Sequence, residues 1–155
     1  MSEEKKTEIL QMIDKISIFG GLNVEQAGKI LDHSNYLEVA KDENVMLQGM
    51  SPKSIYVVLK GRVEVYEESN NKIYPMMFMG EGECFGEVEI LGIFPNMASV
   101  KTVEDTEFIE IPKNQLHKFS HKDMKIFNIL ILNMAREACR RLARADKSLM
   151  EYMCK

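Results

Sequence analysis

The sequence predicts a mainly β protein flanked by helices, folded as a single domain over residues 1–155. Two observations lead to this fold class. Residues 36–112 contain short runs of β-branched and aromatic residues that end near glycines, whereas 3–34 and 113–155 carry apolar residues at helical spacing. Many short strands separated by glycines are typical of small barrels and jelly rolls. We therefore expect a β jelly-roll barrel with helices before it and a long helix after it.

The first helical region, 3–34, is interrupted by the segment FGGLN at 19–23. Asn23 followed by Gln26 predicts a capping box, which would start a second helix. The apolar residues at helical spacing in this region are Ile9, Leu10, Ile13, Ile16, Ala27, Ile30 and Leu31.

The strand region, 36–112, shows the alternation of a half-buried sheet. Val63 and Val65 alternate with Arg62, Glu64 and Tyr66 within SIYVVLKGRVEVYEE. SNNK at 69–72 and EDT at 104–106 each predict a turn between two strands. Glycines at 49, 61, 80, 82 and 86 stand where strands are expected to turn.

The last region, 113–155, carries an apolar stripe at alternating spacings of four and three, which predicts a heptad contact between helices. Basic residues flank this stripe, and we interpret them as a solvated flank. The heptad stripe consists of Ile131, Ala135, Ala138, Leu142, Ala145, Leu149 and Tyr152. It predicts a homodimer through parallel C-terminal helices, although part of the stripe packing on the chain's own barrel is an equal alternative.

Composition excludes several classes of protein. The net charge of −4 and pI of about 5.5 argue against a basic nucleic-acid-binding surface. The three cysteines have no metal-site or disulfide spacing, which favours a reducing compartment. The first ten residues lack a signal-peptide core, and no apolar run reaches the roughly 18 residues of a membrane span. We therefore expect a cytoplasmic protein without membrane contact.

In their order, these segments resemble the cyclic-nucleotide-binding domain family, the domain of catabolite activator proteins and protein kinase A regulatory subunits. The residues that carry the resemblance are ISIFGGLNVEQAGKIL, ENVMLQGMSPKSIYVVLKGRVEVY, MGEGECFGE and NMAREACRRLARADKSLMEYM. They are similar to the family's leading helices, first strands, approach to the phosphate cassette and dimer helix. The resemblance implies a short cassette helix within residues 85–100, which we call the cassette.

The family's cassette reads roughly F-G-E-x-A-L-x-x-x-x-P-R-A-A-T-V, and this chain reads FGEVEILGIFPNMASV. By resemblance, Glu87 would accept a hydrogen bond from the ribose 2′-hydroxyl, and Ser99 would lie near the base. Capping of the turn by Glu87 is an equal alternative, and an ordinary small polar strand residue is the favoured interpretation of Ser99. The N–H groups after Gly86 would face the cyclic phosphate, because helix N-termini suit anions. The implied ligand-binding residues are Gly86, Glu87, Val88, Glu89, Asn96, Met97, Ala98 and Ser99.

Three of these residues depart from the family's pattern. Asn96 stands in place of the phosphate-binding arginine and supplies neither charge nor a bidentate fork. Met97 and Glu89 replace small residues, so we expect bulk and a like charge near the phosphate. Loss of the cation and addition of the carboxylate would each cost about 2–5 kcal/mol of binding. We expect the Glu89 carboxylate to satisfy donors at the cassette helix that a ligand would otherwise take.

Other candidate sites have simpler explanations. His117 and His121 are four residues apart, a spacing that can bind a metal, but a solvated helix face is the favoured interpretation. Cys84 is expected to be a buried, inert thiol. The methionines would fill an irregular core, although Met76, Met77 and Met79 could line a ligand cavity.

The sequence therefore predicts a non-enzymatic regulatory or sensor module with weak or altered nucleotide binding and no cofactor. A second interpretation is a degenerate module that acts only through dimerisation or contact with an unidentified protein. A cupin-like enzyme would need histidines on the strands, and the three histidines lie outside that region. Direct DNA binding would need a helix-turn-helix after the long helix, and none is expected before Lys155.

Overall fold

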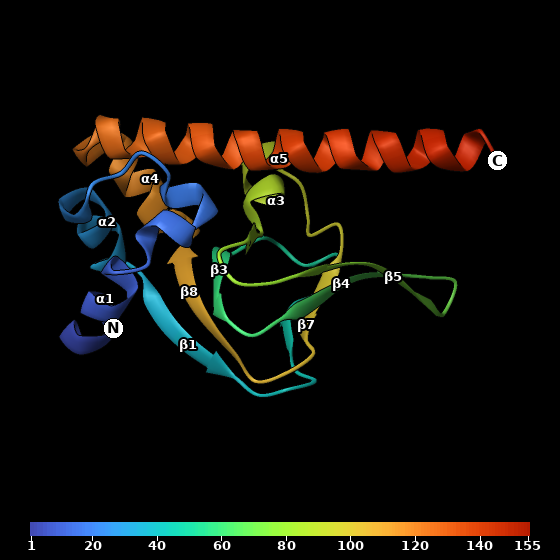
Figure 1. Ribbon diagram of the computed structural model, residues 1–155, viewed down its shortest axis with the longest axis horizontal. Helices are drawn as coiled ribbons and strands as arrows, with labels where there is room; N and C mark the ends of the chain where they lie inside the picture. The colour runs from blue at the N-terminus through green and yellow to red at the C-terminus, as the bar shows by residue number, and fades with distance from the viewer.

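The computed structural model describes residues 1–155 and has the predicted mainly β fold with flanking helices (Figure 1). The N-terminal region contains α1 (Glu3–Leu10), the 3-10 turns η1 (Ile13–Lys15) and η2 (Ser17–Phe19), and α2 (Val24–Leu31). The predicted capping box is present at α2, where Asn23 and Gln26 exchange side-chain-to-backbone hydrogen bonds.

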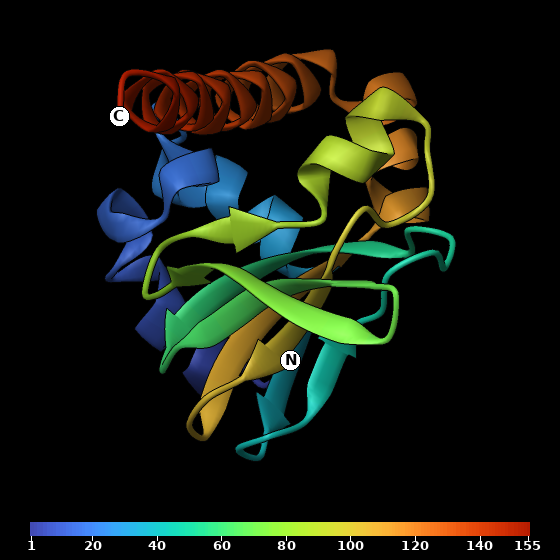
Figure 2. The same ribbon diagram turned by 90° about the vertical axis from the view of Figure 1, so that its right-hand side faces the viewer.

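Eight antiparallel strands form two four-stranded sheets. One sheet has the order β1-β8-β3-β6, and the other has the order β2-β7-β4-β5. The strands are β1 (Asn35–Val39), β2 (Asn44–Met46), β3 (Ser54–Lys60), β4 (Val63–Ser69), β5 (Lys72–Met79), β6 (Cys84–Phe85), β7 (Ser99–Thr102) and β8 (Thr106–Pro112). The two sheets form a jelly roll, and Figure 2 shows the strands lying below the helices.

The turn predicted at 69–72 closes the β4–β5 hairpin. Asn70 and Asn71 both have left-handed backbones, with φ of 52° and 60°. Asparagine tolerates this conformation, which matches the twist of the two strands. The register Ser69↔Lys72 leaves two residues in the turn. β5 is an edge strand, and the hairpin extends away from the barrel (Figure 1).

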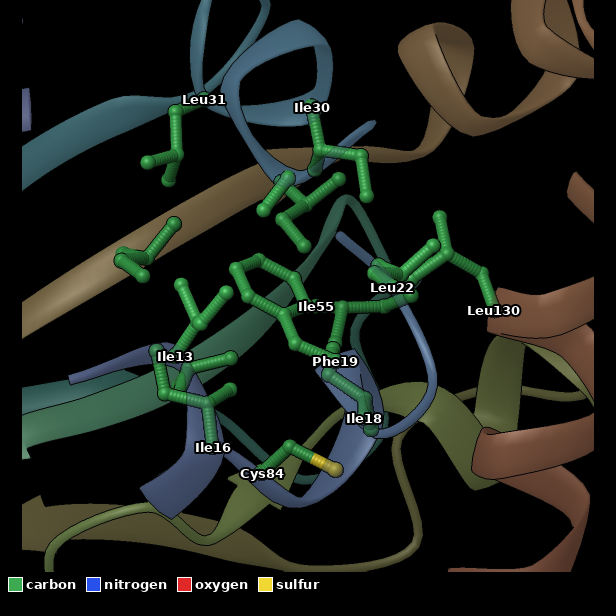
Figure 3. Packing of buried hydrophobic residues seen from close by; sticks show 14 of the residues in the cluster. Ile13, Ile16, Ile18, Phe19, Leu22, Ile30, Leu31, Ile55, Cys84 and Leu130 are labelled. Atoms are coloured by element: carbon green, nitrogen blue, oxygen red, sulfur yellow. The ribbon is translucent and has the colours of Figure 1, made fainter. Parts of the chain in front are cut away.

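Two apolar cores hold the fold together. The larger cluster, of 20 buried residues, lies between the helices and one face of β3 and β8, and Figure 3 shows part of it. The smaller cluster fills the barrel interior between the two sheets. Alternation along β3 divides these roles, because Val57 contributes to the first cluster and Val58 to the second.

Two helices follow the barrel: α4 (Lys113–Lys122) and α5 (Met124–Met153). Asp123 caps α5 by accepting a hydrogen bond from the N–H of Ile126. As far as Arg141, α5 packs on η2, α4 and the cassette, whereas the rest of α5 extends beyond the barrel (Figure 1). None of the helices is long and apolar enough to cross a membrane.

Candidate functional site

The cassette begins with a backbone arrangement that requires glycine. Gly86 joins β6 to the short helix α3 (Glu87–Gly92) and has φ of 87°. A Cβ atom at Gly86 would lie 2.6 Å from the carbonyl oxygen of Ser54. The close passage of β3 therefore fixes the direction of α3 and the position of the first cassette carboxylate.

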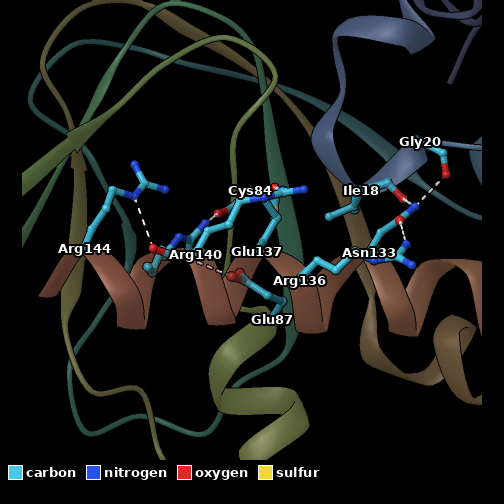
Figure 4. A network of polar contacts seen from close by, with 10 residues as sticks. Ile18, Gly20, Cys84, Glu87, Asn133, Arg136, Glu137, Arg140 and Arg144 are labelled. Atoms are coloured by element: carbon cyan, nitrogen blue, oxygen red, sulfur yellow. Dashed lines mark hydrogen bonds and ion pairs between the residues drawn. The ribbon is translucent and has the colours of Figure 1, made fainter. Parts of the chain in front are cut away.

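Glu87, the expected ribose ligand, is fully buried and is held by the long helix α5. Arg141 Nη1 lies 2.7 Å from Glu87 Oε1, and Arg141 also donates to the carbonyl oxygen of Cys84 (Figure 4). Neither oxygen of Glu87 accepts a hydrogen bond of good geometry. Burial raises the pKa of the Glu87 carboxyl, and the positive charge of Arg141 only partly opposes this.

Glu89 is buried and turned toward the far end of the cassette. Its Oε1 atom lies 3.4 Å from the backbone N of Met97 and accepts that N–H, a long hydrogen bond. The carboxylate thus satisfies a donor just before β7 and none at the N-terminus of α3, which has no side-chain cap. The expectation that Glu89 satisfies donors at the cassette helix is therefore wrong in its location. The side chain of Met97 is 55% exposed, so its bulk lies mostly in solvent. The crowding that we expected from Met97 is therefore wrong for this arrangement.

Asn96 is bound to the loop between β2 and β3. Its N–H donates to the carbonyl of Met50, its carbonyl accepts from the N–H of Gly49, and its Nδ2 donates to the carbonyl of Leu47 at 3.0 Å. These contacts hold Asn96 as a structural residue of the loop. Its Oδ1 atom is buried and has no hydrogen-bond partner.

The remaining cassette residues are held mainly by contacts within the fold. Ser99 Oγ accepts from the N–H of Gln48 at 2.9 Å, and Ser99 also lines an open depression of about 500 Å³. Ala98 is buried, and Val88 is half-buried on α3. The eight predicted residues are thus brought into one segment, but Glu87 faces α5 whereas Asn96 faces the β2–β3 loop.

Arg141 is the functional residue that sequence reasoning missed. The basic residues of α5 were interpreted as a solvated flank, which holds for Arg140 but not for the side chain of Arg141, only 18% exposed. The sequence contains a signal for this burial, because polar residues of α5 recur at the same helical spacing as its buried apolar residues. The residues on this buried side are Ile126, Leu130, Asn133, Met134, Glu137 and Arg141.

Asn133 shows how the polar groups on the buried side of α5 find hydrogen-bond partners. Its Nδ2 donates to the carbonyls of Ile18 and Gly20, at 3.0 and 2.7 Å, and so fixes α5 to η2 (Figure 4). Arg136 donates to Oδ1 of Asn133 at 3.2 Å. The first half of α5 is therefore tied to the body of the domain by polar as well as apolar contacts.

The heptad stripe divides into two parts. Ile131, Ala135 and Ala138 are half-buried, and Ile131 packs against the larger core. The second part is exposed over four members: Leu142, Ala145, Leu149 and Tyr152. The alternative of packing on the chain's own body thus describes the first part of the stripe only.

The histidines, cysteines and methionines that the sequence singled out are not brought together into a site. His117 and His121 lie on the exposed side of α4 with ring centroids 5.1 Å apart, and no group of three or more potential ligands surrounds a metal position. Cys84 is buried, whereas Cys139 and Cys154 are exposed, and all three are free. Met79 lies in the barrel core and Met76 in solvent, so the alternative of a methionine-lined cavity is not formed. The favoured interpretation, that the methionines fill the core, holds for Met46, Met79 and Met134 but is wrong for the seven exposed ones.

A family model described as the cyclic nucleotide-binding domain matches residues 36–123, which include seven strands and the cassette. The chain belongs to this family. A cyclic nucleotide-binding domain from Methylobacillus flagellatus superimposes with a TM-score of 0.85, at 19% identity, over 96% of this chain and 84% of that one.

Two further relatives extend the comparison. A regulatory subunit of a cAMP-independent protein kinase A from Trypanosoma brucei, a mutant bound to cAMP, has a TM-score of 0.78 at 16% identity, over 95% of this chain and 52% of that one. Lysophospholipase NTE1 of Kluyveromyces lactis is 32% identical over 81 residues. That match covers 50% of this chain and 6% of the enzyme, so the chain spans only a small part of that relative.

Proposed function

We propose that this domain is a non-enzymatic regulatory module whose cassette binds cyclic nucleotides weakly or not at all. One observation carries the proposal: the Glu89 carboxylate takes the N–H of Met97, next to the position of the missing arginine. A phosphate brought to this end of the cassette would meet the buried carboxylate of Glu89, and Asn96 would supply no positive charge. Both effects oppose the binding of an anion.

The Trypanosoma relative supports this reasoning. In the mutant bound to cAMP, a glutamate-to-alanine change is followed seven residues later by threonine-to-arginine and then directly by valine-to-alanine. Glu89, Asn96 and Met97 of this chain have the same spacing, and Glu89 is the same residue type as the glutamate changed there. That this protein is described as cAMP-independent, and that the mutant changed at these three positions is bound to cAMP, agrees with weak cyclic-nucleotide binding here.

The other end of the cassette supports a retained regulatory role. The buried Glu87 carboxylate has no hydrogen bond of good geometry beyond its ion pair, and it would accept one from a ligand hydroxyl that displaced its present neighbours. Because Arg141 joins Glu87 to α5, a ligand at Glu87 would act directly on the position of the long helix. This connection supports a module that transmits binding through α5.

Thermal-shift measurement with cyclic AMP, cyclic GMP and adenosine tests the proposal. Binding to the native state raises the apparent stability by RT ln(1 + [L]/Kd). We expect no shift with either cyclic nucleotide below millimolar concentration. Adenosine lacks the phosphate, so it serves as the matched control for charge and should bind no more weakly than cyclic AMP. A low-micromolar Kd for either cyclic nucleotide by calorimetry would contradict the proposal.

A second candidate is a module that acts only through dimerisation or contact with another protein. The observation in its favour is the exposed second half of α5, where Leu142 is 62% and Tyr152 79% exposed. Parallel pairing with a second copy would cover these apolar side chains. In this case no ligand would shift the stability, and the assembly state would carry the function.

We place both candidates in the cytoplasm, since three free cysteines agree with a reducing compartment. We propose no cofactor and no direct contact with DNA or membrane. The lipase activity of the lysophospholipase relatives is not assigned to this chain, because the match covers 6% of the first of them.

A further inference from the structure

The exposed side of α4 is a basic surface on a chain whose net charge is −4. The helix contains three lysines, two histidines and no acidic residue. Leu116 and Phe119 are buried against the core, so the opposite side of the helix faces solvent. Lys53, in the β2–β3 loop, is exposed beside its first turn. We call this surface the basic face, and it consists of Lys53, Lys113, His117, Lys118, His121 and Lys122.

The lysines of the basic face have no counterions within the protein. None of Lys53, Lys113, Lys118 and Lys122 takes part in an ion pair, whereas each lysine of α1 and α2 is paired with a carboxylate. Lys118 and Lys122 are four residues apart, so their like charges are neighbours on the helix surface and repel each other. An anion bound between them would turn this repulsion into attraction.

Two carboxylates border the basic face, and both have other partners. Asp123 accepts the N–H of Ile126 with Oδ1, and its Oδ2 lies 3.9 Å from Nζ of Lys29. Glu110 accepts hydrogen bonds from two neutral side chains, at 2.8 and 2.9 Å. The positive charge of the four lysines is therefore not neutralised by the chain itself.

One end of the basic face borders an open hollow of about 580 Å³. Lys53 and Lys113 both line it, and the N–H of Lys113 donates to the carbonyl of Lys53 at 2.9 Å, which fixes their backbones side by side. Asn114 and His117 add further polar side chains to its wall, opposite Glu110. None of the lining residues belongs to the cassette. The hollow has room for an acidic side chain between two lysines.

The composition of the basic face favours a protein partner over a membrane or a nucleic acid. A helix that lies in a membrane surface needs large apolar side chains on its outer side, and those of α4 are buried. Surfaces that bind single-stranded nucleic acid use aromatic side chains for stacking, and the basic face has none and no arginine. From Lys113 to Lys122 the helix rises by roughly 14 Å, which about four residues of an extended chain cover.

We propose that the basic face is a docking surface for an acidic segment of another protein, an extended stretch rich in glutamate and aspartate. One carboxylate enters the hollow between Lys53 and Lys113, and later ones pair with Lys118 and Lys122. In Figure 1, α4 lies at the opposite end of α5 from the C-terminus. The surface shares no residue with the cassette or the heptad stripe, so the proposal is independent of both candidate functions.

Titration of ¹⁵N-labelled protein with an acetylated and amidated hexaglutamate peptide, followed by NMR, tests the surface. We expect saturable shifts at the amides of α4 and Lys53, and weaker binding at higher salt concentration. A hexaglutamine peptide of the same length is the matched control and should cause no saturable shifts. Hexaglutamate shifts that are absent, or that lie only outside α4 and the β2–β3 loop, would overturn the proposal.

Two double variants with the same change of net charge complete the test. Lys113→Gln, Lys118→Gln should weaken hexaglutamate binding about fivefold or more, as expected for loss of two exposed ion pairs. Lys41→Gln, Lys72→Gln changes two exposed lysines elsewhere and should leave binding unchanged. Equal weakening in both double variants would show that net charge alone attracts the peptide, which would overturn the proposal.

Three further results would assign the basic face to another occupant and overturn the acidic segment. Phosphatidylserine vesicles that bind more tightly than hexaglutamate, and less tightly to Lys113→Gln, Lys118→Gln, would identify a membrane. The same result with a single-stranded oligonucleotide would identify a nucleic acid. A smaller assembly for this double variant than for wild type in sedimentation would identify a second copy of the chain.

Discussion

The two ends of the cassette differ in what holds them. The first end, at Glu87, is tied to the long helix α5 by a buried ion pair with Arg141. The last end, at Asn96 and Met97, is tied to the β2–β3 loop and to Glu89 by hydrogen bonds. One end therefore depends on an ion pair with a helix that extends out of the domain, and the other depends on local hydrogen bonds.

This difference shows how the cassette keeps a fixed contact with α5 at one end while its other end carries a neutral asparagine. An ion pair between buried groups is costly to break from either side, so Glu87 and Arg141 are each constrained by the other. Asn96 has no such partner, because its amide is neutral and forms hydrogen bonds with the β2–β3 loop only. The predictions below separate the two ends.

The largest effect is expected at the last end of the cassette. The triple variant Glu89→Ala, Asn96→Arg, Met97→Ala removes a like charge and supplies a guanidinium. At about 2 kcal/mol or more for each of these two effects, cyclic-AMP affinity by calorimetry should rise on the order of a thousandfold. The gain should exceed the sum of the single changes, because neighbouring sites couple.

The single variants give the controls. Asn96→Arg alone should not restore binding, because Glu89 would pair with the new guanidinium. Met97→Ala alone should have little effect, since that side chain is 55% exposed. Rescue by Asn96→Arg alone would show that Glu89 does not oppose the phosphate. A folded triple variant without affinity would show that the pocket differs elsewhere.

At the first end of the cassette, Arg141→Met should destabilise the domain by about 3 kcal/mol, because it leaves the buried Glu87 without its partner. Urea unfolding measures this change. Arg144→Met, a change of the same kind on the exposed side of α5, should stay within about 0.5 kcal/mol of wild type. The double variant Glu87→Leu, Arg141→Met should recover most of the loss, since no charge then remains buried. If the single variant Arg141→Met is as stable as wild type, the ion pair is not what links Glu87 to α5.

The sequence predicted the fold well because its signals are local. The capping box at Asn23 and Gln26 and the turn at Asn70 and Asn71 depend on residues close together in the chain. The spacing of apolar residues separated strands from helices for the same reason, because it is also a local pattern. The surroundings of Glu87 were not predicted, because Arg141 comes to it from a distant helix through the packing of α5 on the barrel.

The same limit explains the errors at the last end of the cassette. Residue type alone indicated that Asn96 lacks a charge, but not that its amide would bond to the carbonyl of Leu47. The size of Met97 suggested crowding, whereas the backbone at the start of β7 directs its side chain into solvent. Side-chain direction at a loop end depends on tertiary contacts that no short pattern contains.

The second half of α5 offers a test that leaves both cassette ends intact. Leu142→Glu should weaken dimerisation about tenfold or more, because a charge replaces an apolar contact, while monomer stability changes by no more than about 0.5 kcal/mol at this exposed position. Sedimentation measures the assembly state. Arg144→Glu, on the basic flank, is the control and should remain dimeric. Wild-type protein that sediments as a monomer at high micromolar concentration would contradict the dimer.

The smallest effect is the pH dependence of the first cassette end. The pKa of Glu87 is raised in the folded state, mainly by burial, from a usual value of 4.5. The native protein then holds a proton that the unfolded chain releases, so stability falls as pH rises between the two pKa values. Glu87→Gln removes this titration. Urea unfolding of both proteins from pH 4 upward should show wild type losing stability relative to Glu87→Gln until the folded pKa is passed, and then a constant difference. A wild type that gains stability relative to the variant over this range would mean that Arg141 outweighs burial and that Glu87 stays ionised, with a lowered pKa.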